Sequence, residues 1–163
     1  MSSGILAASE VNALWTKFQG SGHEFRAVSF RLSESRNDIV IDDEDFQIPS
    51  DRSRCPLEET AEVFEKIKAR LNDGAKSDLN LPRWIVINVE FKYANGGIQT
   101  DKNVLIKWMP STCKPKDRMC YASSTKGFQD NLTPKWCGAV VQADDIDDIN
   151  DIIKNLEDKK LIG

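Results

Sequence analysis

Histidine is almost absent from the sequence, and cysteine is sparse and scattered. The 163 residues include one histidine, His23, and four cysteines: Cys55, Cys113, Cys120 and Cys137. No two cysteines form a CxxC pair, whereas a structural zinc site needs four clustered ligands, usually in closely spaced pairs. We therefore expect neither a metal centre nor a cofactor.

The sequence also lacks long apolar runs and the common catalytic motifs. No stretch approaches the roughly 20 apolar residues that cross a bilayer, and no basic segment followed by an apolar one opens the chain as a secretory signal would. There is no GxxxxGK[ST] phosphate loop and no GxSxG motif. We expect an intracellular protein that is not an enzyme and that keeps its cysteines as free thiols.

Two acidic runs, 42–45 and 144–148, could suggest calcium binding. An EF-hand loop requires glycine at its sixth position and glutamate at its twelfth. Counted from Asp144, these positions hold Ile149 and Asn155, so the motif fails. Favourable charge at a helix N-terminus and solvation explain the runs better.

Overall charge and composition are those of an ordinary globular domain. The chain has 22 basic and 26 acidic residues, a net charge of -4, a pI near 5.1 and 40% hydrophobic residues. This balance argues against a general nucleic-acid or anionic-membrane binder, although a local basic patch remains open. The length fits one domain over residues 1–163, which we expect to be monomeric.

Hydrophobic periodicity predicts alternating helices and strands. Apolar residues at helical spacing predict helices over 10–18, 57–71, 114–132 and 146–161, and β-rich runs predict strands over 25–32, 39–41, 84–93, 103–109 and 139–142. Asn95-Gly96-Gly97 predicts the turn of a central hairpin. The fold class is therefore α/β (α+β): a central mixed sheet of about five strands flanked by four or more helices.

The predicted helix 114–132 has two contrasting faces. At 100° per residue, one face gathers an apolar set: Tyr121, Thr125, Phe128 and Leu132. The opposite face gathers Lys116, Met119, Ser123 and Gly127. The segment 111–126 carries a net charge of +3 inside an acidic protein. An outward methionine among small residues and cations suits a contact surface for an acidic partner, and a merely solvated face is the alternative. Close approach of a partner or simple tolerance would explain Gly127.

The segment 116–124, KDRMCYASS, resembles the start of the long actin-binding helix of the actin-depolymerising factor (ADF)/cofilin family. Other parts resemble the family in the same order: Ser3-Gly4-Ile5 near the start, 89–93 with Gly96-Gly97, the Ile-x-Trp-x-Pro segment 106–110, and 139–144. The resemblance covers nearly the whole chain. It implies a single ADF-homology domain without enzymatic activity.

The resemblance also implies a partner and a site. Such proteins bind actin monomers, prefer the ADP form, and promote filament disassembly in the cytoplasmic cytoskeleton. Carried over by position, the monomer-binding residues are Ser3, Gly4, Ile5, Lys116, Arg118, Met119 and Ser123. Ser3 matches the family's regulatory phosphorylation site, and the basic residues match a surface that binds phosphoinositide headgroups.

The filament-binding surface departs from the family pattern. Its basic positions are reduced to Lys102, Lys154, Lys159 and Lys160, and Gln129-Asp130 replaces a basic pair. Residues 144–158 hold seven acidic side chains against Lys154 alone. We therefore expect weak filament side-binding and weak severing. Compared with typical members of the family, the chain also has extra residues around 47–56 and 71–81. These residues form either passive surface loops or a further contact with a partner.

Three other functions compete with this interpretation. Glia maturation factor has the same fold and acts on the actin-related branching complex; Cys113-Lys114-Pro115 and Pro82-Arg83 resemble it, whereas Trp108 and the Lys116/Arg118 pair favour cofilin. A general interaction module with another partner is the second. An enzyme is the third, and the chain offers no reacting constellation for it.

Overall fold

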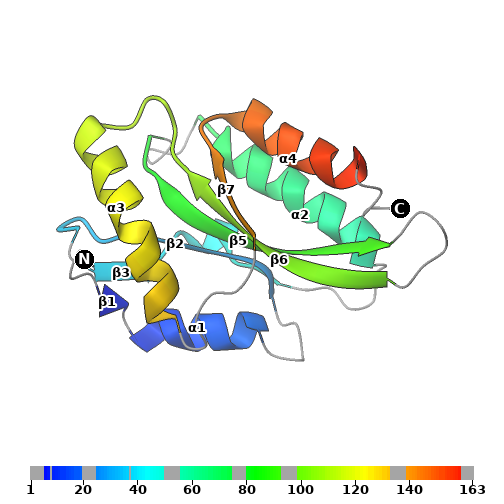
Figure 1. Ribbon diagram of the computed structural model, residues 1–163, viewed down its shortest axis with the longest axis horizontal. Coiled ribbons are helices and arrows are strands. Elements are labelled where there is room, and N and C mark those ends of the chain that lie inside the picture. Colours follow the sequence, from blue (N-terminus) through cyan, green and yellow to red (C-terminus); the bar gives the residue numbers. More distant parts are fainter. Residues whose placement is uncertain are drawn as a thin grey trace.

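The computed structural model describes residues 6–7, 9–19, 25–36, 38–49, 56–74, 80–92, 99–132 and 139–158. These residues form one mixed sheet between two layers of helices (Figure 1). This arrangement places the long helix α3 (Pro115–Asn131) at the surface of the molecule (Figure 1).

The sheet is built around a long central hairpin. Strands β5 (Arg83–Lys92) and β6 (Gln99–Trp108) pair antiparallel along their whole length. On the β5 side follow β2 (Phe25–Leu32), β3 (Asp38–Ile41) and the two-residue strand β1 (Leu6–Ala7), and β4 (Ile48–Pro49) also pairs with β2. On the other side β7 (Ala139–Ala143) runs parallel to β6 and forms the edge.

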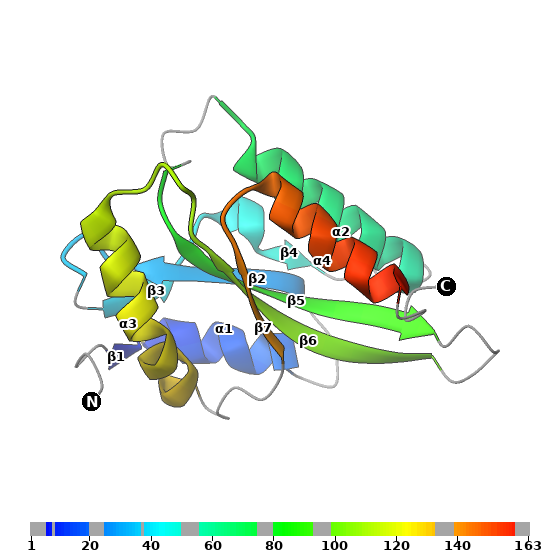
Figure 2. The same ribbon diagram turned by 45° about the horizontal axis from the view of Figure 1, so that its top comes forward.

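Two helices cover each face of the sheet. Helix α1 (Ser9–Gln19) and helix α3 (Pro115–Asn131) lie on one face, and α2 (Pro56–Leu71) and α4 (Ile146–Asp158) lie on the other (Figures 1 and 2). A single 3-10 turn, η1 (Glu44–Phe46), precedes β4 in the part of the chain that is described.

Alternation along the strands divides the interior into two cores. In β5, Trp84 and Val86 enter the core under α1 and α3, whereas Ile85 and Ile87 enter the core under α2 and α4. This follows from the period of two along a strand, which sends neighbouring side chains to opposite faces. Because both faces are covered, the central strand is buried on both sides and reads as an almost continuous apolar run.

The structure confirms the predicted fold class and most element positions. The two-residue strands β1 and β4 and the turn η1 were not predicted, because such short elements carry no periodicity. Strand β6 begins at Gln99 rather than at 103, since polar residues before Asn103 hide the pattern. The predicted turn Asn95-Gly96-Gly97 lies outside the described residues.

Candidate functional site

Helix α3 begins with a proline in its first turn. Lys114 is the N-cap residue, in an extended conformation and without a capping side-chain hydrogen bond, and Pro115 follows it. Proline suits this position because its missing N–H would have no partner within the helix. The basic segment identified in the sequence therefore coincides with the start of α3.

The inner face of α3 is fixed by an aromatic cluster around Trp84. The Trp84 ring centroid lies 4.9 Å from that of Tyr121 and 4.7 Å from that of Phe128, with which it stacks. Trp84 Nε1 donates to Thr125 Oγ1 over 3.1 Å. Leu132 is buried as well, so all four residues predicted for the apolar face lie in the interior.

Tyr121 also ties α3 to β2. The backbone N–H of Leu32 donates to the Tyr121 hydroxyl oxygen over 2.8 Å. Burial raises the pKa of Tyr121 from 10.0 to about 12, because the phenolate would lose its hydration. This contact sets the rotation of α3 on the sheet, and so decides which residues face outward.

The outer face of α3 presents a methionine beside cations. Met119 is 71% exposed, and only Val140 accompanies it as an exposed large hydrophobic residue in the described part of the chain. Lys116, Ser123 and Lys126 are exposed on the same helix. Among the described residues, no carboxylate lies within ion-pair distance of Lys116. Because methionine is flexible and polarizable and is common at adaptable binding surfaces, this face suits a protein partner.

Arg118 has intramolecular partners, unlike Lys116. Its Nη1 donates to the backbone oxygen of Met109 over 3.2 Å, and its Nη2 lies 3.3 Å from Asp144 Oδ1 at the junction of β7 and α4. This pair could not be predicted from the sequence, since only the fold brings the two positions together. Arg118 is therefore half-buried at the flank of the face that carries Met119.

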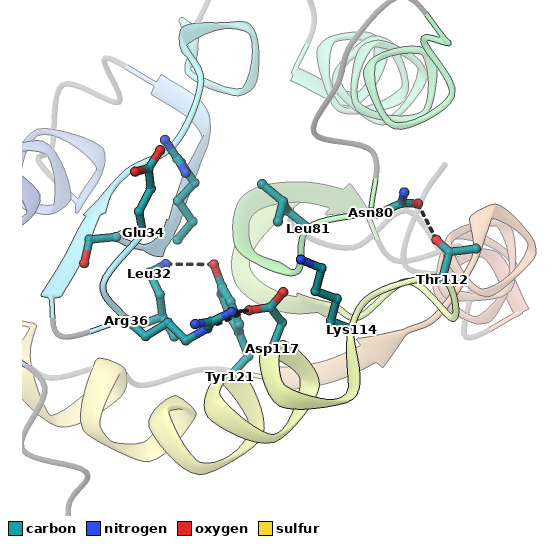
Figure 3. A pocket seen from close by; sticks show the side chains of 11 residues that line it. Leu32, Glu34, Arg36, Asn80, Leu81, Thr112, Lys114, Asp117 and Tyr121 are labelled. Carbon is teal, nitrogen blue, oxygen red and sulfur yellow. Dashed lines mark hydrogen bonds and ion pairs between the residues drawn. The ribbon is translucent and has the colours of Figure 1, made fainter.

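A second ion pair holds the first turn of α3 from the opposite flank. Asp117 Oδ1 lies 2.7 Å from both Nε and Nη2 of Arg36, a residue of the β2–β3 turn with a φ of 63° (Figure 3). A positive φ is costly for a non-glycine residue, so the surrounding contacts must maintain it. The position of the first turn is thus fixed relative to the sheet.

A cavity of about 400 Å³ lies beside this ion pair (Figure 3). Its wall includes Leu32 and Glu34 from β2 and the following turn, Asn80 and Leu81 ahead of β5, and Lys114 and Tyr121 of α3. Two of its cations, Arg31 and Arg36, are within ion-pair distance of Asp42 and Asp117. Among the described residues, the lining includes no histidine or cysteine.

The structure brings part of the predicted monomer-binding set together. Lys116, Met119 and Ser123 are exposed on α3, with Arg118 at their flank. Ser3, Gly4, Ile5, Lys159 and Lys160 lie outside the described residues, and the side chains of Lys102 in β6 and Lys154 in α4 also lie outside them. The roles given to all these residues stay predictions.

Gly127 does not belong to the outer face. Helical phase predicted an outward position for Gly127, but this residue is buried, so close approach of a partner does not explain it. Ser124 and Phe128, both buried, flank it on the inner side of α3. The buried side of the helix is therefore wider than the apolar residues alone indicate, because it includes small residues.

The described cysteines and helices add little to this site. Cys113 is a buried free thiol and Cys120 a half-buried one, while Cys55 and Cys137 lie outside the described residues. No described group of three or more His, Cys, Asp or Glu side chains is arranged to hold a metal ion. No helix within the described ranges combines the length and the hydropathy that spanning a bilayer requires.

Comparison with known proteins identifies the class of this domain. Residues 4–156 match the family model for cofilin/tropomyosin-type actin-binding proteins. A search of the curated proteins finds no match. Because the family model covers nearly the whole sequence, the chain belongs to the ADF/cofilin family of non-enzymatic actin-binding proteins.

Solved structures support the same fold. Actin depolymerization factor 2 of Plasmodium berghei is 18% identical, with a TM-score of 0.67 and coverage of 96% of this chain and 97% of the other. An ADF-like protein of Caenorhabditis elegans is 20% identical, with a TM-score of 0.66 and 96% coverage of both chains. Glia maturation factor of Caenorhabditis elegans is 19% identical, with a TM-score of 0.58 and coverage of 99% and 100%. The fold alone therefore does not distinguish an actin-depolymerising factor from a glia maturation factor.

Proposed function

We propose that this protein binds actin monomers, with a preference for the ADP form, and thereby promotes filament disassembly in the cytoplasm. The observation that carries the proposal is the outer face of α3, where Met119 is 71% exposed beside the exposed Lys116. The match to the family model for actin-binding proteins supports it.

The face has the composition of a binding surface with one apolar anchor. Interface energy is concentrated in a few well-packed residues, whereas exposed charges at the rim contribute about 0–1 kcal/mol each. Met119 is the anchor, and Lys116 and Arg118 attract the acidic surface of actin. The inner face of α3 is packed through Trp84 and Tyr121, so the helix backbone that carries the anchor loses little conformational entropy on binding.

Filament side-binding is the weaker activity in this proposal. Asp145, Asp147 and Asp151, at and near the start of α4, are exposed. In the family this region contacts the filament through basic residues. Here the region is acidic, and its negative charge would oppose binding to an acidic filament surface. Monomer binding at α3 does not depend on the charges of Asp147 and Asp151, since α4, which carries them, lies on the other face of the sheet (Figure 2).

Regulation at the N-terminus follows from the same electrostatics. Ser3 matches the family's phosphorylation site, and a phosphate adds about -1.5 to -2 charges. Next to an acidic actin surface this charge would oppose binding. Phosphoinositide headgroups, which would compete with actin for the basic residues, remain a proposal of the same kind.

Titration of fluorescently labelled ADP-actin monomers tests the proposed function. We expect wild-type protein to bind, and the double variant Lys116→Ala/Arg118→Ala to bind several-fold more weakly, because two charges at the rim of an interface together contribute about 1–2 kcal/mol at most. The matched control is Lys17→Ala/Lys66→Ala, which removes two exposed lysines of α1 and α2. Equal binding by the two double variants would contradict the assignment to α3.

A debranching activity like that of glia maturation factor is the second candidate. The fold similarity to the Caenorhabditis elegans protein over the whole chain supports it, as does Cys113-Lys114-Pro115 before α3. A debranching assay separates the two functions. Release of filament branches without any effect on actin monomers would favour this candidate over monomer binding.

A further inference from the structure

Arg118 is already engaged within the molecule, although the proposed function assigns it to an acidic partner. Its Nη2 lies 3.3 Å from Asp144 Oδ1, with 39% of the Arg118 side chain and 41% of the Asp144 side chain exposed. Its Nη1 donates to the Met109 backbone oxygen. A partner that approaches α3 therefore meets an ion pair at this position, not an isolated cation.

The carboxylate of this pair has further contacts at the junction of β7 and α4. Gln142 Nε2 donates to Asp144 Oδ1 over 3.0 Å, and the Asp144 backbone N–H donates to Asp148 Oδ2 over 2.7 Å. The N–H of Asp148 in turn donates to Asp145 Oδ1 at the start of α4. Asp144 thus has partners besides Arg118, whose long side chain lies on the exposed flank of α3.

We propose that Asp144 is a specificity-determining residue that opposes binding at α3 through its ion pair with Arg118. This inference rests on the proposed function. An acidic group of actin that reaches Arg118 either displaces Asp144 or binds beside it, and in both cases the Asp144 carboxylate repels that acidic group. A surface without a well-placed carboxylate gains nothing from Arg118, so Asp144 discriminates against it.

Displacing Asp144 from Arg118 costs little free energy, because exposed ion pairs are weak. Asp144 therefore reduces the affinity for actin without preventing binding. The contribution is electrostatic, so it should decrease as added salt screens the charges.

The variant Asp144→Asn tests the inference. Asparagine keeps an oxygen that can accept from Gln142 but carries no charge. We expect ADP-actin monomers to bind this variant about two- to fivefold more tightly at low ionic strength, the range typical of one exposed ion pair. The gain should shrink at high salt. Asp144→Ser provides a second uncharged acceptor, and circular dichroism confirms that each variant is folded.

Two comparisons separate this effect from a change in net charge. Asp147→Asn makes the same change in charge at an exposed position of α4 with no ion-pair partner among the described residues, and we expect it to bind as wild type does. In an Arg118→Gln background, Asp144→Asn should no longer increase the affinity, because the residue through which Asp144 acts is absent.

Several results would overturn the inference. Unchanged or weaker binding by Asp144→Asn would mean that Asp144 has no effect on Arg118 or positions it for binding. A gain that persists without Arg118, or an equal gain from Asp147→Asn, would indicate a general charge effect. Wild-type protein that fails to bind ADP-actin monomers would refute the proposed function itself, and this inference with it.

Discussion

Tyr121 is the residue that links the position of α3 most directly to the sheet. Its hydroxyl accepts from the Leu32 N–H, and its ring packs against Trp84. An aromatic side chain with a satisfied polar end contributes both buried area and a fixed orientation. The outward direction of Met119, two residues earlier, depends on this contact.

Replacing Tyr121 with phenylalanine should destabilise the protein by about 1–3 kcal/mol, because the buried Leu32 N–H loses its acceptor. The loss is measured by urea unfolding at neutral pH.

The pH dependence of the same variant provides an independent check. The folded-state pKa of Tyr121, about 12, lies above the ordinary value of 10.0, so the unfolded chain ionises first. Wild-type protein should lose stability between pH 10 and 12 as the unfolded state releases this proton. Tyr121→Phe lacks the proton, so the difference in unfolding free energy between the two proteins should narrow over that range. A constant difference would contradict the burial of the hydroxyl.

Charged pairs within the fold are the residue-level features that the sequence does not reveal. Arg83 Nε lies 2.8 Å from Asp42 Oδ2 with both side chains fully buried, and Arg36 pairs with Asp117. Hydrophobic periodicity carries no information on such long-range partners. The sequence could therefore place Lys116 and Arg118 on one helix, but not show that Asp144 contacts only the second.

At the level of elements, helical periodicity was sufficient for the inner face of α3 and insufficient for its edges. Tyr121, Thr125, Phe128 and Leu132 are buried as predicted, because large apolar residues must be removed from water. Gly127 was placed on the outer face by its phase at 100° per residue, which does not show how far the buried side extends around the helix. The outer face itself was correctly identified by Met119 and its exposed neighbours.

The acidic exposed surface at the start of α4 leads to a testable expectation. Reversing two exposed charges with Asp147→Lys/Asp151→Lys should strengthen pelleting with actin filaments by about 1–2 kcal/mol at low salt, and leave monomer binding unchanged. The control is Glu10→Lys/Glu44→Lys, which makes the same charge change at exposed positions of α1 and η1. If wild-type protein already pellets stoichiometrically with filaments at high salt, the filament surface is not weak.

At the level of the whole molecule, the order of helices and strands was predictable because each long element has a clear hydrophobic period. The mixed sheet follows from a central hairpin combined with a parallel edge strand. The short strands β1 and β4 arise from tertiary pairing and leave no pattern in the sequence. The cavity beside Arg36 and Asp117 is likewise a product of the fold.

The affinity of Met119→Ala for ADP-actin monomers tests the central claim most directly. Met119 is exposed, so the variant should be as stable as wild type. We expect its binding to weaken by about 2 kcal/mol, or roughly 30-fold, as for the anchor of an interface. Val140→Ala, which truncates the other exposed large hydrophobic residue of the described chain, should bind almost as wild type does. Wild-type affinity in folded Met119→Ala would contradict the account.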